Sequence, residues 1–206
     1  MKTLSVLFAV VWGAISLRAG PTTTLDVAWE LANGKYVGWT YGPNESSHQV
    51  DCVQFVLAVI EKQIGRALTP EARKAVLINY GWGEDETQKI AQAGTDPKLG
   101  GACYALTDIS HIGIAVPLDN AQPGDIVQYW MYSKGTGKWF GHSGVIAEIT
   151  KDRAATLLGA HASLGRVGLS LKLLRLVKDE DRRIYVVRLP TESLPPSNAH
   201  TTISIQ

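Results

Sequence analysis

The sequence from Gln49 to Val56 reads Gln-Val-Asp-Cys-Val-Gln-Phe-Val and marks the point where an extended segment turns into a helix. Beyond it, apolar residues recur at the spacing of one helix face: Val53, Val56, Leu57, Ile60 and Ile64. This spacing predicts a helix that begins at or near Cys52 and buries one side. We expect the helix to run to about Gln63, with Gly65 as its end.

The position of Cys52 suits a nucleophile. The first turn of a helix offers unpaired backbone N–H groups and the positive end of the helix dipole, and both favour a thiolate. A thiol so placed can have its pKa lowered from about 8.5 into the range of about 3.5–7.5. Two structural alternatives stay open, a buried core thiol and a disulfide with Cys103, the other cysteine of the chain. A domain of this size does not need a single bridge to hold its core.

Length and composition indicate one globular domain. The chain has 206 residues, of which 45% are hydrophobic and 19% are charged, and its formal net charge is +1. So small a net charge gives no reason to expect a nucleic-acid partner or an electrostatic attachment to a membrane.

Both termini differ from the domain between them. A basic start and an apolar run from Leu4 to Leu17 resemble a secretory signal peptide, so we expect residues 1–19 to be removed and the protein to be secreted or periplasmic. The run is too short for a membrane span of about 20 residues, so no stable membrane insertion is expected. An uncleaved anchor or a buried helix is the alternative. Residues 190–206, rich in Ser, Thr and Pro, predict a disordered tail, which leaves 20–189 as the domain.

Helix signals dominate the first half of this domain. We expect a lead-in helix over 21–34, a loop over 35–50, and a further helix from Thr69-Pro70 to about Asn79. The stretch 68–112 is predicted to be a loop-rich insertion with one short helix near 84–93, and loops of this length often have a function.

Strand signals follow Pro123-Gly124-Asp125. Alternating and β-branched residues predict strands at Ile126–Trp130, Ser143–Ile149, Ala154–Leu158 and Arg183–Arg188. Helices first and strands after them predict an α+β fold, with N-terminal helices packed on a C-terminal antiparallel sheet.

Two of the five histidines stand at the ends of these strands: His142 opens the strand that runs to Ile149, and His161 follows the end of the next strand. If the strands on either side of a turn at Lys151-Asp152 pair symmetrically, His142 and His161 meet at one end of the sheet. With Cys52 supplied by the packed helix, His142 would be the general base and His161 the group that orients it. Two histidines and a cysteine are also ligand types of a zinc site, but no carboxylate is placed to support one, so we expect no metal and no cofactor.

The order of five short motifs resembles the NlpC-type cell-wall cysteine peptidases, a papain-like family that cleaves peptidoglycan stem peptides. The motifs are Trp39-Thr40-Tyr41-Gly42, Asp51-Cys52-Val53-Gln54-Phe55-Val56, Pro123-Gly124-Asp125-Ile126-Val127, Gly141-His142-Ser143-Gly144-Val145-Ile146 and His161-Ala162-Ser163. Each motif alone is weak, and their shared order over 35–189 carries the resemblance.

The resemblance implies a papain-like catalytic domain in which Cys52 is the nucleophile, His142 the base and His161 the third member. It also implies that Trp39 or Tyr41 stands near the oxyanion site, and that the partner is a peptidoglycan peptide or another amide. The chain departs from the family where Val53-Gln54 replaces Ser-Gly after the nucleophile.

Two other functions stay open. One is a CHAP-type amidase that releases the peptide from the sugar; that family usually has an acidic residue at the third position, where this chain has His161. The other is a catalytically silent module that holds a peptide or glycan in the same groove, for which the Val53-Gln54 departure is the argument.

Overall fold

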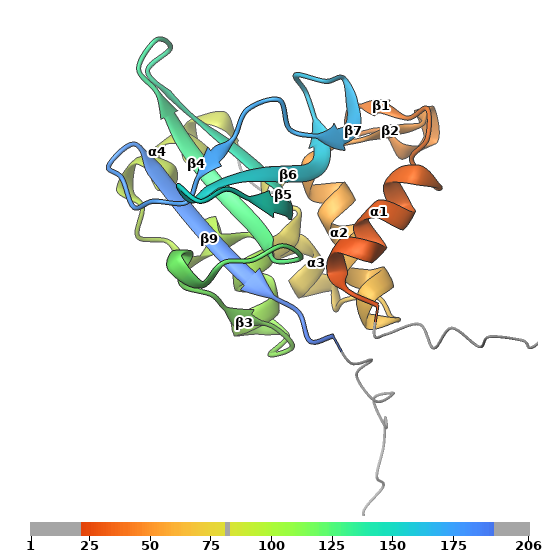
Figure 1. The fold of residues 1–206 in the computed structure, drawn as a ribbon. Helices are drawn as coiled ribbons and strands as arrows, with labels where there is room; N and C mark the ends of the chain where they lie inside the picture. The colour runs from red at the N-terminus through yellow and green to blue at the C-terminus, as the bar shows by residue number, and fades with distance from the viewer. Residues whose placement is uncertain (1–21, 81–82, 192–206) are drawn as a thin grey trace, which may run out of the picture.

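The computed structural model describes residues 22–80 and 83–191, so the predicted signal peptide (residues 1–19) and most of the predicted tail (residues 190–206) lie outside the described residues. Figure 1 shows helices on one side of a curled sheet, and the α+β class is confirmed. The helices are α1 (Thr24–Asn33), α2 (Cys52–Ile64), α3 (Pro70–Val76), α4 (Glu84–Ala93) and α5 (Ala102–Tyr104). The strands are β1 (Thr40–Tyr41), β2 (Gln49–Val50), β3 (Ile114–Ala115), β4 (Ile126–Ser133), β5 (Lys138–Ile149), β6 (Ala154–His161), β7 (Arg166–Leu169), β8 (Leu174–Arg175) and β9 (Arg182–Arg188).

The strands form one sheet in the order β2-β1-β7-β6-β5-β4-β9-β3, with β8 paired to β6. The predicted C-terminal strands pair antiparallel, as expected, and the first half of the chain adds β1 and β2, which pair with each other in parallel. The chain between them turns through a 3-10 helix at Glu45–Ser47 and returns in the same direction. Strands of two residues are too short to show a periodic pattern, which is why 35–50 was predicted as loop alone.

Helix α2 is the central helix, and its sequence explains both of its ends. Asp51 caps it: the Gln54 backbone N–H donates to Asp51 Oδ1 at 2.9 Å, and the Asp51 backbone N–H donates to Gln54 Oε1 at 3.0 Å. Such a capping box satisfies two N–H groups that the helix leaves unpaired. Gly65 ends the helix with a φ of +69°.

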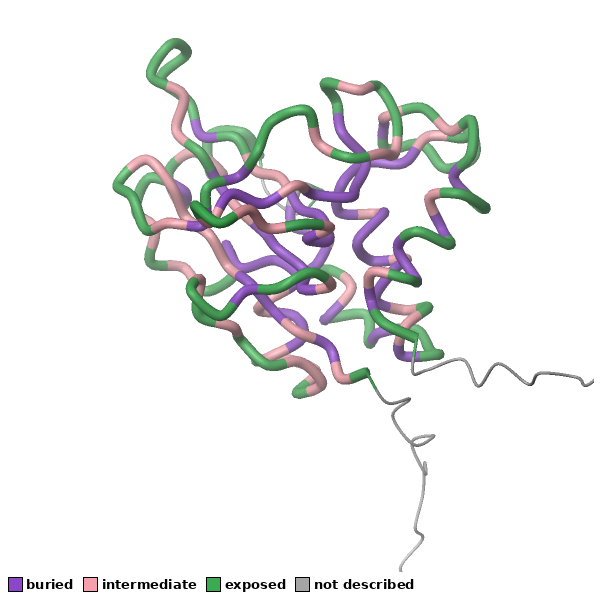
Figure 2. The backbone as a smooth tube through the Cα atoms, viewed as in Figure 1, coloured by how far each residue is buried: buried purple, intermediate pink, exposed green. Residues whose placement is uncertain are grey.

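The buried face of α2 packs on the sheet and forms the main core. Phe55, Val56 and Ile60 have no exposed surface and cluster with Val145 and Leu158 of β5 and β6. Figure 2 shows buried residues running along α2 and along the strands that face it. Burying each such side chain contributes about 1.5–3 kcal/mol, so this contact holds the first residue of α2 against the sheet.

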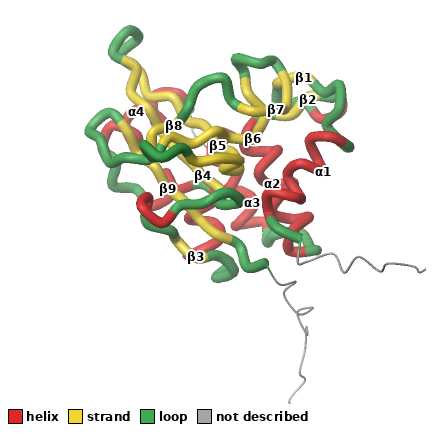
Figure 3. Tube along the Cα trace, viewed as in Figure 1, coloured by secondary structure: helices red, strands yellow, loops and turns green. Residues whose placement is uncertain are grey.

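The insertion at 68–112 contains more helix than predicted. Helices α3 and α4 lie where the sequence placed them, although α3 stops at Val76. Helix α5 and a π-helical turn at Ala105–Ile109 replace part of the expected irregular loop. Figure 3 shows α3 and α4 of the same stretch in the helix colour. A helix of three residues lies below the length at which apolar periodicity can be recognised.

Asp125 lies at the start of β4 and anchors β9 as well as its own turn. The carboxylate, with 1% of its side chain exposed, accepts from the Gln122 backbone N–H at 2.9 Å, as expected of a turn aspartate. It also accepts from Arg188 Nε at 2.7 Å and Nη2 at 2.9 Å, a bidentate pair that the sequence did not predict.

Replacing Arg188 by methionine is expected to lower the free energy of unfolding by about 3 kcal/mol, because it leaves the buried Asp125 carboxylate without its cation. Urea denaturation measures the loss. The matched control is Lys134→Met, which removes an exposed pair with Asp181 and should change stability by less than about 1 kcal/mol. Equal losses in the two variants would contradict the assignment of Arg188 as an anchor.

Candidate active site

Cys52 is the first residue of α2, as predicted, and only 1% of its surface is exposed. Its thiol lies beside Ser143 on β5 and Tyr41 on β1, and the Ser143 hydroxyl is buried without a hydrogen-bond partner. Around it lies an apolar cluster that includes Ile78 of the insertion and Trp130 of β4. The sulfur is therefore held where the start of α2, the middle of β5 and the first strand meet.

The predicted lowering of the Cys52 pKa is wrong for this structure. Burial, followed by the nearby Asp51 carboxylate, raises the pKa of Cys52 to about 11, against the opposing effect of Ser143 and the Val53 N–H. Desolvation disfavours the thiolate by more than the N–H groups and the dipole of the helix N-terminus favour it. The thiol is neutral at ordinary pH.

His142 and His161 lie together, as the hairpin prediction requires. Strands β5 and β6 pair with Val145 opposite Leu158, and the two imidazole rings have centroids 4.7 Å apart with 37° between their planes. His142 also meets Tyr129 edge-on at 5.6 Å. One expectation needs correction, because β5 begins at Lys138 and His142 therefore lies inside the strand and does not open it.

The electrostatics of both rings favour the neutral form. Burial, followed by the neighbouring His161, lowers the pKa of His142 to about 3. Burial also lowers the pKa of His161, against the opposing effect of the Leu157 and Gly168 carbonyls. The Nε2 atom of His161 lies 3.2 Å from the Leu157 oxygen, while Nε2 of His142 is buried without a hydrogen-bond partner.

The structure brings the two histidines together, and it shows no contact between them and the Cys52 sulfur in the described part of the chain. Among the described residues, no hydrogen bond joins the Cys52 sulfur to the His142 ring, and the two histidines touch ring to ring. Ser143 lies beside the sulfur, and successive side chains of a strand point to opposite faces, so the side chain of His142 lies on the other face of β5, which it shares with Ile146. A base within hydrogen-bond reach of the sulfur therefore requires His142 to rearrange when substrate binds.

Of the two aromatic candidates, Tyr41 is the one beside the sulfur. Its pKa is raised by burial and then by Cys52 and Asp51. The Trp39 ring instead packs edge-on against Tyr36 at 5.0 Å and His48 at 5.3 Å. Register places Tyr41 opposite Val50, two residues before Cys52, and so favours Tyr41 over Trp39.

Sequence reasoning missed two residues that support this site. Tyr80 donates from its hydroxyl to Asp51 Oδ2 at 2.6 Å, and Gln54 donates from Nε2 to the Pro43 carbonyl at 2.9 Å. The Asp-x-x-Gln spacing of a capping box was visible in the sequence and explains why Gln54 follows the nucleophile. No local signal connects Tyr80 to Asp51, which stands 29 residues earlier.

The buried histidines predict an acid-sensitive fold. The folded-state pKa of His142 is far below the ordinary 6.5, so between about 6.5 and 3 the unfolded chain binds a proton that the folded protein does not. The free energy of unfolding is therefore highest above about 6.5 and decreases as the pH falls towards 3. We expect the melting temperature to fall over this range and His142→Gln to reduce the dependence. His111→Gln, at an exposed position, is the control. An unchanged slope in His142→Gln would contradict the assignment.

The alternatives for Cys52 can be compared with the structure. Both cysteines are free thiols, so the chain in this state has no bridge between Cys52 and Cys103. Within residues 22–80 and 83–191, no group of three His, Cys, Asp or Glu side chains could hold a metal ion. In the same part of the chain, no helix has the length and apolar character needed to cross a membrane.

Comparisons with known proteins identify no relative. No protein-family model matches the chain, and no curated protein is similar enough to count as a relative. The arguments about function therefore rest on the motifs and on the geometry around Cys52, His142 and His161.

Proposed function

We propose that the protein is a papain-like cysteine hydrolase that cleaves amide bonds of peptidoglycan stem peptides. One observation carries the proposal: Cys52, the first residue of α2, lies beside β5, the strand whose His142 makes ring contact with His161. A nucleophile, a base and a group that holds the base are the three parts that acyl transfer through cysteine needs.

The proposed reaction transfers one proton and one acyl group. His142 accepts the Cys52 proton as the sulfur attacks the amide carbonyl carbon, and the carbon–nitrogen bond then breaks while His142 gives that proton to the departing amine. Water activated by His142 hydrolyses the thioester and restores the thiol. The hydroxyl of Tyr41, beside the sulfur, and the N–H groups at the start of α2 are the donors available to the oxyanion.

The resting electrostatics impose a condition on this mechanism. With the Cys52 pKa raised and the His142 pKa lowered, a thiolate–imidazolium pair is disfavoured in the free protein. Proton transfer must therefore accompany attack on a bound carbonyl, whose developing negative charge stabilises the imidazolium. His161 is a positioning residue in this account, since its ring packs on His142 and its Nε2 faces the Leu157 carbonyl.

A second function is favoured by a specific observation. The 1% exposure of Cys52 and its neutral state also suit a module that binds a wall peptide or glycan without cutting it. A CHAP-type amidase would use the same thiol and differ in the bond cleaved. For the peptidase, the amidase and the binding module alike, we propose that the N-terminal segment directs export. The protein would then be secreted or periplasmic and would meet its substrate there.

The test is to incubate the purified protein with intact peptidoglycan and with isolated stem peptides, and to identify the products by mass spectrometry. Cleavage between two amino acids supports the peptidase. Release of whole stem peptides from the sugar supports the amidase. Retention on peptidoglycan without new products supports the binding module, and neither binding nor cleavage contradicts all three proposals.

A further inference from the structure

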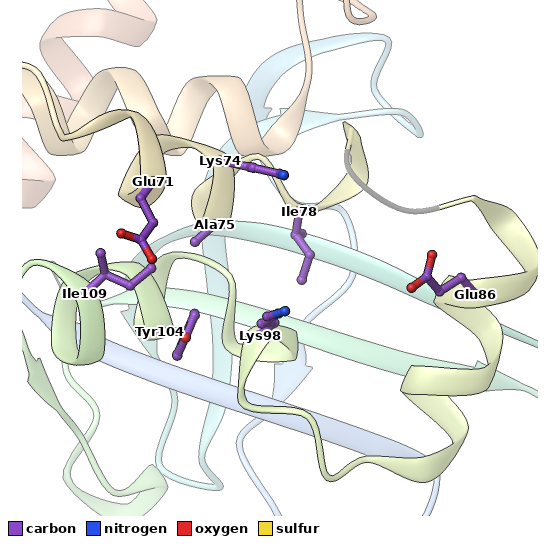
Figure 4. A pocket seen from close by; sticks show the side chains of 8 residues that line it. All are labelled: Glu71, Lys74, Ala75, Ile78, Glu86, Lys98, Tyr104 and Ile109. Atoms are coloured by element: carbon purple, nitrogen blue, oxygen red, sulfur yellow. The ribbon is translucent and has the colours of Figure 1, made fainter.

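A cavity of about 410 Å³ lies within the insertion, away from the three proposed catalytic residues. Its wall is made by α3, α4, α5 and the turns between them. Figure 4 shows the eight lining residues: Glu71, Lys74, Ala75, Ile78, Glu86, Lys98, Tyr104 and Ile109. Its volume is in the range of small-molecule sites, about 300–1,000 Å³.

The cavity in the insertion is lined by two carboxylates and two ammonium groups that can interact with a ligand. In Figure 4, Glu71 and Glu86 lie on opposite sides of the cavity, and the ammonium groups of Lys74 and Lys98 lie between them. None of these four side chains takes part in the ion pairs found among the described residues. A ligand can therefore meet both signs of charge without first breaking a salt bridge.

This arrangement selects a class of ligand. Two carboxylates repel a nucleotide or other polyanion, and two ammonium groups repel a polyamine. An uncharged sugar would gain no charge–charge attraction from these four side chains, which water solvates. We propose that the cavity binds a short peptide with a free ammonium and a free carboxylate, the carboxylate between Lys74 and Lys98 and the ammonium at Glu71 or Glu86.

The apolar part of the cavity supports a peptide and connects it to the proposed active site. Ala75, Ile78 and Ile109 offer surface for small side chains, and Tyr104 adds a hydroxyl. Ile78 also belongs to the buried cluster that contains Cys52. Ile78 thus belongs both to the cavity wall and to the cluster around Cys52, and the proposed binding function of the cavity does not depend on whether Cys52 reacts.

Calorimetric titration with trialanine tests the proposal. The probes are trialanine with both ends free, the N-acetylated form and the C-amidated form. We expect the free form to bind, each blocked form to bind about tenfold more weakly, and Lys98→Met and Glu86→Gln each to weaken the free form by a similar factor. The four charged side chains are exposed, so these variants should fold, and their melting temperatures check it.

Two controls separate this site from the rest of the protein. Lys151→Met removes an exposed lysine from the β5–β6 turn and should leave binding unchanged. Cys52→Ala should also leave trialanine binding unchanged, which distinguishes failure of this site from failure of the proposed hydrolase. The inference is overturned if trialanine does not bind at millimolar concentration, or if it binds equally well to Lys98→Met and Glu86→Gln.

Discussion

Replacing Cys52 by alanine is expected to lower the rate of amide hydrolysis by at least about three orders of magnitude, because no acyl-enzyme can form without the sulfur. The measurement is the initial rate of product formation from peptidoglycan peptides, followed by mass spectrometry. The substitution should be tolerated by the fold, since alanine occupies less space in the same cluster and keeps the helix start.

Cys103→Ala is the matched control for this experiment. Cys103 is the other cysteine, is partly buried on α5, and lies with its sulfur 3.6 Å from the Val186 carbonyl. It should retain full activity. Hydrolysis that survives in Cys52→Ala would exclude Cys52 as the nucleophile, and loss in both variants would point to a general effect on folding.

His142→Ala is expected to reduce hydrolysis by about 10²–10⁴-fold, the usual contribution of a positioned general base. His161→Gln should cost less, because it removes a packing partner of His142 and leaves the base in place. The comparison is made on kcat/KM over a range of pH. We expect His161→Gln to move the pH profile as well as the rate, since His161 helps to lower the pKa of His142.

His48→Ala is the control for a general loss of histidine. His48 is exposed, has a positive φ of 52° and packs against Trp39, away from the Cys52 sulfur. It should leave kcat/KM within about twofold of the unsubstituted protein. A His142→Ala variant as active as His48→Ala would remove His142 from the mechanism.

The juxtaposition of His142 and His161 could be predicted from sequence because hairpin geometry is simple. Antiparallel strands about a short turn pair residues whose numbers have a constant sum, and this brought the two histidines together without any tertiary information. The start of α2 was equally accessible, since Asp51, Gln54 and the apolar spacing are all local signals.

The protonation state of Cys52 and the identity of its aromatic neighbour could not be predicted, because both depend on contacts with residues far away in the chain. Ile78 and Trp130 enclose Cys52, and this burial reverses the expected direction of its pKa shift. The choice of Tyr41 over Trp39 depends on the pairing of two strands that are only two residues long. Local propensity carries no information about either contact.

The most direct test of the account is to look for the thioester. Purified protein is mixed with peptidoglycan stem peptides, the reaction is stopped with acid during turnover, and the peptide that contains Cys52 is mapped by mass spectrometry. We predict an added mass equal to the acyl part of the substrate on Cys52, absent from Cys103 and lost in His142→Ala. Turnover without any acyl group on Cys52 would contradict the account.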